Sequence, residues 1–288
     1  MKIRLLLLIF PLLSFSQSYQ VQDSKSKEPI PFVNIWIKDA ASGTTSNENG
    51  KFELAIKLTD ILILSAIGYE RLEVPFRSFE AAILMNRSVE QLDAVVIDKS
   101  KNTIQNSYGV LRSRKYKSYF GCSSIPWMLG ARIPYKSVYD KNPFVSGFKI
   151  PTSSNIKNAK FAIRLYEATD ILYQFPLNDK PIYAYAPKGR KITYVDLKEE
   201  SLKFPKNGLV IVLEFLIISE NLYEYKYTTA EGKKNQKAIS YEPAFAYRTE
   251  NKLGSSTVKY FNGAWSVMDA TYFNAAEKEF ALELIMNN

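Results

Sequence analysis

Three tyrosines at alternate positions, Tyr223, Tyr225 and Tyr227, have the spacing of a binding surface. Alternate residues of a strand point to the same face, so the three rings would lie side by side. An aromatic ring offers an apolar face, and the tyrosine hydroxyl adds a polar rim that suits a sugar ring. The sequence therefore predicts a ligand-contact surface here, with a structural ladder of packed rings as the alternative. The other candidates for this platform, each with core packing as its alternative, are Tyr183, Tyr185 and Trp265.

Catalysis by a nucleophile and an imidazole base is excluded because the chain contains no histidine. The same absence removes histidine-ligated zinc, whereas carboxylate chemistry survives. Adjacent carboxylates on a strand point to opposite faces, and alternation alone does not set the separation of about 5 to 10 Å in a glycosidase pair. We therefore predict no catalytic residues and keep a carboxylate-based secreted hydrolase as the alternative. Its candidate residues would be Glu199, Glu200, Glu214 and Glu220.

No cofactor-binding or metal-ligating residues are predicted. The polar loop at residues 46–49 offers oxygen atoms that calcium prefers, but Glu48 is its only carboxylate, and a structural turn explains the loop more simply. The single cysteine, Cys122, cannot form an intramolecular disulfide. We expect it to pack as a small buried hydrophobe, with a reactive thiol as the alternative.

The N-terminal segment has the layout of a cleavable signal peptide at residues 1–16. Lys2 and Arg4 precede an apolar run, and small residues follow at Ser14 and Ser16. The run is shorter than the roughly 20 residues of a membrane-spanning helix, so we expect no transmembrane span in the mature chain. Removal of the two cations lowers the formal charge from +9 to +7. Export argues against nucleic acid as a partner class, and none is predicted.

Length and composition predict two all-β domains in the 288-residue chain. Tyrosine and phenylalanine are abundant, 19 and 17 residues against 12 glycines, and such residues fit pleated sheets. We predict a first β-sandwich at residues 17–98 and a larger one at residues 119–288. Between them, residues 99–118 lose the strand pattern and read as a basic linker. Its cations are Lys99, Lys101, Arg112, Arg114, Lys115 and Lys117.

The first domain shows short strands separated by turn residues. Strands are expected at residues 32–37, 52–56, 60–65, 72–74 and 92–97, and Asn49 followed by Gly50 is a strong hairpin signal. The ordered motifs at residues 29–34, 43–52, 64–69 and 92–97 closely resemble the carboxypeptidase-like regulatory domain. That resemblance implies a seven-stranded, transthyretin-like sandwich that is non-catalytic and accessory. It also implies the Gram-negative envelope, where such domains often precede TonB-dependent receptors. About 190 residues follow it here, too few for a plug and a large barrel, so receptor transport is not predicted.

The second domain has strand signals at residues 160–166, 191–197, 209–216, 222–227, 240–247 and 280–286. On the strand at 160–166, Phe161, Ile163 and Leu165 are expected on one face and Arg164 with Tyr166 on the other. Several of these segments and the late Trp265 look like jelly-roll sandwiches attached to such regulatory domains, which implies a jelly-roll-like fold. No catalytic residue set comes with that resemblance.

Together these features predict a non-catalytic, exported envelope protein that acts as a binding or assembly module. Its expected partner is an envelope protein or a glycan, and its expected place is the periplasm or the outer membrane, with secretion as an alternative. A purely structural surface protein is the third class that the sequence leaves open.

The signal peptide yields a direct prediction. Because the charged, apolar and small-residue regions end at Ser16, the mature protein should begin near Gln17. N-terminal sequencing of the native protein measures this, and Met1 on protein from a soluble cytoplasmic fraction would contradict it.

Overall fold

The structure is a computed structural model that describes residues 18–76, 82–88, 103–111, 116–169, 176–178, 180–248, 253–268 and 279–288. Within these ranges the chain is all-β, as predicted, and its helices are three short 3-10 segments, η1 (Ser137–Lys141), η2 (Lys198–Glu200) and η3 (Ser219–Asn221). None of the helices described has the length and apolar character needed to span a bilayer. The signal peptide, the expected strand at 92–97 and most of the linker's cations lie outside the described residues.

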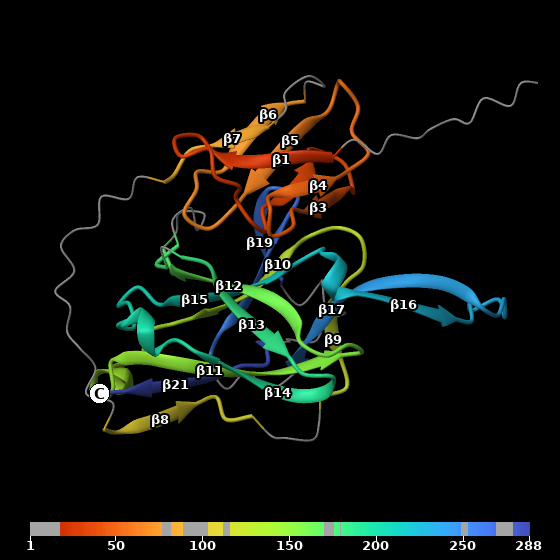
Figure 1. The fold of residues 1–288 in the computed structure, drawn as a ribbon. Helices are drawn as coiled ribbons and strands as arrows, with labels where there is room; N and C mark the ends of the chain where they lie inside the picture. The colour runs from red at the N-terminus through yellow and green to blue at the C-terminus, as the bar shows by residue number, and fades with distance from the viewer. Residues whose placement is uncertain are drawn as a thin grey trace, which may run out of the picture.

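The N-terminal unit is a sandwich of two sheets (Figure 1). One sheet has the strand order β4-β1-β7, and the other has the order β3-β2-β5-β6. The strands in chain order are β1 (Ser18–Asp23), β2 (Asn34–Ile37), β3 (Gly43–Thr45), β4 (Lys51–Glu53), β5 (Ile61–Ser65), β6 (Leu72–Pro75) and β7 (Ile83–Met85). Seven strands among the described residues agree with the expected seven-stranded sandwich.

Its core follows from alternation along these strands. Val21, Phe52 and Met85 from one sheet pack against Ile35, Leu64 and their neighbours from the other. A turn is confirmed at Gly50, which has a φ of +68°, but it is no hairpin, because the flanking strands β3 and β4 belong to different sheets. A side chain there would also lie 2.6 Å from the carbonyl oxygen of Val21, so both the backbone conformation and the close approach favour glycine.

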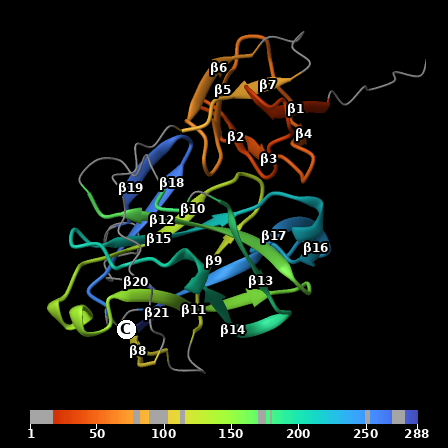
Figure 2. The ribbon, with the colours of Figure 1, turned by 60° about the vertical axis from the view of Figure 1, so that its left-hand side comes forward.

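The C-terminal unit consists of two larger sheets packed face to face (Figures 1 and 2). A six-stranded sheet has the order β13-β12-β15-β10-β18-β19, and an eight-stranded sheet follows the path β16-β17-β11-β21-β8, with β14, β20 and β9 joined to β11 or β17. The strands are β8 (Gln105–Tyr108), β9 (Tyr119–Cys122), β10 (Met128–Ile133), β11 (Phe144–Ser154), β12 (Ala159–Glu167), β13 (Ile182–Ala186), β14 (Gly189–Asp196), β15 (Leu209–Phe215), β16 (Leu222–Tyr227), β17 (Gln236–Arg248), β18 (Ser256–Phe261), β19 (Ala264–Val267), β20 (Glu279–Phe280) and β21 (Glu283–Asn287).

The structure differs from the expected linker at β8. This strand pairs with β21, and Leu111 just after it is buried beside Ala246 and Ala281. The strand pattern was absent because Gln105, Asn106 and Ser107 are all exposed on the sheet edge. Such an edge strand is held by backbone hydrogen bonds rather than by an apolar face, so composition does not reveal it.

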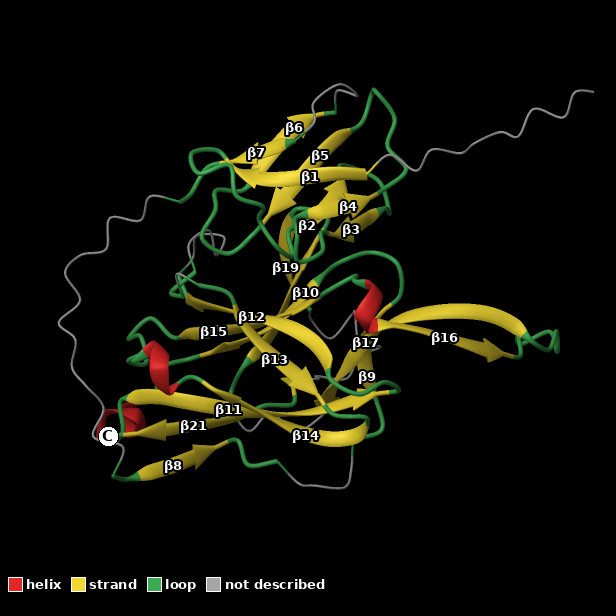
Figure 3. Cartoon of the chain, in the orientation of Figure 1, coloured by secondary structure: helices red, strands yellow, loops and turns green. Residues whose placement is uncertain are grey.

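The six-stranded sheet is apolar on both faces. On β15, Leu209, Ile211 and Leu213 pack in the main core, whereas Val210 and Val212 face the other way. Trp36 and Ile63 of the N-terminal unit cover this outer face, and both are buried. The Trp36 indole Nε1 donates to the Pro126 carbonyl at 2.6 Å, so the two units share a close-packed interface. Figure 3 shows β19 reaching this boundary.

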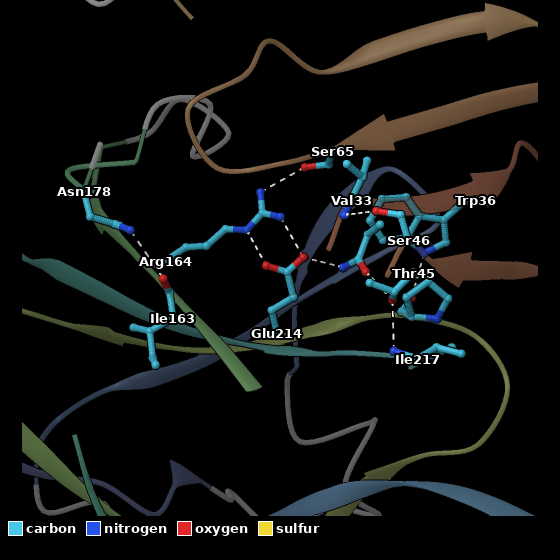
Figure 4. Close-up of polar contacts among 12 residues, drawn as sticks. Val33, Trp36, Thr45, Ser46, Ser65, Ile163, Arg164, Asn178, Glu214 and Ile217 are labelled. Atoms are coloured by element: carbon cyan, nitrogen blue, oxygen red, sulfur yellow. Dashed lines mark hydrogen bonds and ion pairs between the residues drawn. The ribbon is translucent and has the colours of Figure 1, made fainter. Parts of the chain in front are cut away.

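A buried ion pair lies at the centre of the interface (Figure 4). The Arg164 guanidinium donates Nε to Oε2 of Glu214 at 2.8 Å and Nη2 to Oε1 at 2.7 Å. Nη1 donates to the Ser65 hydroxyl at 2.9 Å, and Asn34 donates its amide to Oε1 of Glu214. Although burial favours the neutral form, the Glu214 carboxylate raises the pKa of Arg164 above its usual value. Both units therefore complete one polar network.

This network predicts a large stability effect for Glu214→Gln. The substitution leaves a buried guanidinium without its counter-charge, so the free energy of unfolding should fall by about 3 to 5 kcal/mol. Urea unfolding followed by circular dichroism measures it. Lys206→Gln removes the exposed pair between Lys206 and Asp140, 2.6 Å apart, and serves as a control with little expected effect. Equal, small losses for the two variants would contradict the role given to the buried pair.

Candidate functional site

The three predicted tyrosines form a continuous row on the outer strand β16, which extends from the body in Figure 3. Tyr225 is 40% exposed and Tyr227 is 45% exposed, while Tyr223 is half-buried. The rings of Tyr223 and Tyr225 are stacked at 6.0 Å with an interplanar angle of 13°, and Tyr227 follows at 6.3 Å. Their cross-strand partners are Ser240, Ala238 and Gln236. Because those partners are small or polar, the rings stack along one strand and remain accessible.

A groove of about 410 Å³ begins at the inner end of this row, and we call it the tyrosine groove. Tyr223, Tyr225 and Tyr241 supply aromatic walls. Polar side chains also line it, namely Ser153, Asn155, Ser240 and Glu242. It therefore combines ring faces with hydrogen-bonding groups, which is the mixture that a polar ring-shaped ligand needs.

Glu242 is the acceptor in this groove. The residue is 5% exposed, and its Oε1 accepts hydrogen bonds from Asn155 Nδ2 at 2.8 Å and from the Ser240 hydroxyl at 3.2 Å. These donors hold the carboxylate in one orientation at the wall. Sequence reasoning missed Glu242, because Asn155 lies 87 residues away and only the sheet brings the two together.

Cys122 also lines the groove, as a buried thiol. Its Sγ donates to the Ile125 carbonyl at 3.2 Å, and burial raises its pKa to about 12. A thiol with so high a pKa is almost entirely protonated at neutral pH and is a poor nucleophile. Cys122 is therefore buried, as predicted for a small hydrophobic residue.

The other aromatic candidates lie elsewhere. Trp265 packs against Tyr260 at 5.1 Å and Tyr166 at 6.0 Å, in the interface between the units. Tyr183 lies edge-on to Phe32 at 5.2 Å, and Tyr185 is exposed on the same strand β13. The structure therefore divides the six predicted aromatic residues, and only the three on β16 form one surface.

The four carboxylates considered for hydrolysis are also dispersed. Glu214 is occupied by the Arg164 pair, and Glu220 accepts from the Ser219 hydroxyl at 3.0 Å. Glu199 and Glu200 lie in the short helix η2 rather than on a strand.

The polar loop at residues 46–49 uses its side chains to build a turn. The Asn47 Oδ1 accepts from the backbone amides of Asn49 and Lys51, and the Ser46 hydroxyl accepts from the Val33 amide. These hydrogen bonds agree with the structural turn that the sequence favours for this loop. No group of three Asp, Glu or Cys side chains suited to a metal ion occurs in the described part of the chain.

A second hollow, which sequence reasoning did not find, lies between the two units. This cleft of about 440 Å³ has the N-terminal loops carrying Phe32, Tyr69 and Arg87 on one side. Residues of the C-terminal unit, including Tyr183 and Lys180, form the other side, and the Arg164–Glu214 pair also lines it. It exists only where the units meet, so no local motif marks it.

Residues 19–97 match the sequence profile of the CarboxypepD_reg-like domain. Within the same region, 70 residues are 33% identical to the TonB-dependent receptor SusC of Bacteroides thetaiotaomicron. Residues 19–97 form a carboxypeptidase-like regulatory domain. The predicted resemblance is thereby confirmed for the N-terminal unit. The SusC match spans 24% of this chain and 7% of the receptor, so it concerns that segment alone.

Two solved structures show remote likenesses to this chain. The cysteine protease and lectin-like domains of Cwp84, a surface layer associated protein of Clostridium difficile, align at 12% identity and a TM-score of 0.37. That alignment covers 85% of this chain and 45% of the other. An infectious bursal virus particle protein aligns at 11% identity and a TM-score of 0.25, over 94% of this chain and 58% of the other. Neither likeness carries an argument about function.

The state of Cys122 leads to a labelling prediction. Because burial raises its pKa to about 12, the native thiol should react with Ellman's reagent at pH 8 far more slowly than the thiol in denatured protein. The rate of absorbance change, with and without guanidinium, measures the ratio. Equal rates in the two conditions would show that the thiol is accessible and ionised.

Proposed function

We propose that this protein is an exported, non-catalytic module of the bacterial envelope that binds a glycan through the tyrosine groove and the exposed row beyond it. The observation that carries the proposal is the continuity of stacked, exposed tyrosine rings with a groove that holds the fixed Glu242 carboxylate. A sugar ring stacks on an aromatic face through its C–H groups and donates its hydroxyls to a carboxylate. The β16 row and Glu242 offer both contacts side by side.

The place of action is inferred from the regulatory domain. Its similarity to a segment of a TonB-dependent receptor supports an envelope location, and the signal-peptide layout supports export. Periplasmic and outer-membrane sites fit equally. The proposed division of the mature chain is a regulatory sandwich at 17–98 and a jelly-roll-like sandwich at 119–288, with a connection at 99–118 that adds the strand β8 to the second sandwich.

The absence of catalysis is part of the proposal. Glu242 Oε1 accepts hydrogen bonds from two neutral donors, and Glu214 is paired with Arg164, so each of these carboxylates already makes hydrogen bonds within the fold. A carboxylate-based hydrolase is the rival, and a purely structural surface protein is the third reading. Both are outcomes of the experiments below.

Tyr225→Ala should weaken glycan binding about tenfold or more, since stacking contributes where the ring meets ligand. The fold should be kept, because a surface substitution changes the free energy of unfolding by about 0.5 kcal/mol or less. A glycan array selects the ligand, and calorimetric titration measures its affinity. Tyr194→Ala removes a ring of similar exposure, 44%, from β14 and should leave binding unchanged.

Two results would overturn this assignment. If Tyr225→Ala lowers the unfolding midpoint markedly and leaves binding intact, the rings serve the structure. If the wild-type protein cleaves the bound glycan and Glu242→Gln abolishes cleavage, the protein is a hydrolase. Under the proposal, Glu242→Gln weakens binding and no product forms with either protein.

A further inference from the structure

We propose that the cleft between the two units binds a small anionic ligand, a carboxylate or phosphate group carried on a compact ring-shaped body. This inference does not rest on the tyrosine groove, because the two hollows have no lining residue in common. The cleft holds about 440 Å³, which lies within the range of ordinary ligand pockets.

The charges in the cleft favour an anion. Its described lining contains three cations, Arg87, Arg164 and Lys180, and one carboxylate, Glu214, which leaves a formal excess of two positive charges. Arg164 and Glu214 neutralise each other through two hydrogen bonds. Asp23, which is outside the lining, pairs with Arg87 at 2.7 Å, so the net excess is one positive charge, shared between Arg87 on the N-terminal unit and Lys180 on the C-terminal unit. An anion between them would interact with both units.

Arg87 is held in place by one edge of its guanidinium. Its Nε donates to Asp23 Oδ2 at 2.7 Å, and its carbon lies 5.5 Å from the centre of the Tyr69 ring. Its side chain is nevertheless 63% exposed. Among the described residues, its terminal nitrogens have no hydrogen-bond partner. A guanidinium presented in this way suits the two oxygens of a carboxylate or phosphate.

Asp23 does not depend on Arg87 for its charge. Backbone amides of Ser26 and Lys25 donate to its Oδ1, and these bonds lower the pKa of Asp23 well below its usual value. The Tyr69 hydroxyl donates to Oδ2. Asp23 is therefore an ionised anchor that orients Arg87, while the outer part of the guanidinium stays available to a ligand.

The walls suit a compact body. Phe32 and Tyr183 meet edge to face across the boundary at 5.2 Å, and Pro31 and Pro181 add rigid apolar surface. Phe32 has a φ of +53°, a left-handed conformation that is uncommon for an aromatic residue and costs backbone energy. Strain of this kind is typical of binding sites, where it fixes the direction of a side chain. Here it directs the ring into the boundary between the units.

The test uses the full mature chain and two pairs of probes. Oligomers of galacturonic acid carry carboxylates, and their methyl esters keep the size and rings without the charge. Inorganic phosphate and a buffer blank free of phosphate and sulfate form the second pair, which separates a phosphate source from a carboxylate source. Calorimetric titration should show saturable binding of at least one anion and none of the methyl ester. Tyr225→Ala should not change it, so this result is distinguishable from failure at the tyrosine groove.

Variants locate the binding. Lys180→Gln and Arg87→Gln should each reduce affinity about tenfold, because each removes a charged partner of the anion. Lys57→Gln and Lys188→Gln remove exposed cations from each unit outside the cleft lining and are the matched controls. Arg87→Lys keeps the positive charge and should retain part of the affinity. That result would show that the loss in Arg87→Gln comes from the missing charge and not from misfolding. Equal affinity for ester and acid, equal losses in the controls, or no saturable binding of either anion would overturn the proposal.

Discussion

The arrangement of the molecule depends on the outer face of the six-stranded sheet. A strand such as β15 is buried along its whole length, so an exposed outer face would place Val210 and Val212 in water. The regulatory domain covers that face with Trp36 and Ile63. The same strand also carries Glu214, whose charge needs a partner once the face is covered, and Arg164 on the adjacent strand supplies it. Ser65 and Asn34 complete the set from the other side.

The two hollows depend on this interface to different degrees. The tyrosine groove is built by β9, β11, β16 and β17 of the C-terminal unit, so its geometry comes from pairing within one sheet. The cleft has one wall on each unit and keeps its shape only while the units stay docked. Loss of the Arg164–Glu214 pair would therefore disturb the cleft first. The tyrosine groove thus depends on one sheet alone, whereas the cleft depends on both units.

Local sequence patterns correctly predicted strands and the faces on which their side chains lie. The alternation on β12 placed Phe161, Ile163 and Leu165 on one face, and these residues lie in the main core. The strand signal at residues 209–216 is confirmed by β15, and Tyr223, Tyr225 and Tyr227 share an accessible face. The partners of charged residues could not be predicted, because they are remote in sequence. Asn34 and Glu214 are 180 residues apart, and Asn155 and Glu242 are 87 apart. The strand β8 was missed because it has no apolar face.

The buried ion pair at this boundary fixes the orientation of the two units more tightly than apolar contacts do. Apolar contacts such as those of Trp36 and Ile63 are non-directional, and a shift of the regulatory domain along the sheet would preserve much of their burial. Hydrogen bonds tolerate no such shift, since a displaced Ser65 or Asn34 would leave buried polar atoms unpaired. Thr45 adds a further fixed point, because its hydroxyl donates to Asn34 at 2.8 Å and accepts from the Ile217 amide at 3.0 Å. Apolar burial thus supplies the affinity between the units, and the polar network selects one orientation, the one in which residues of both units line the cleft.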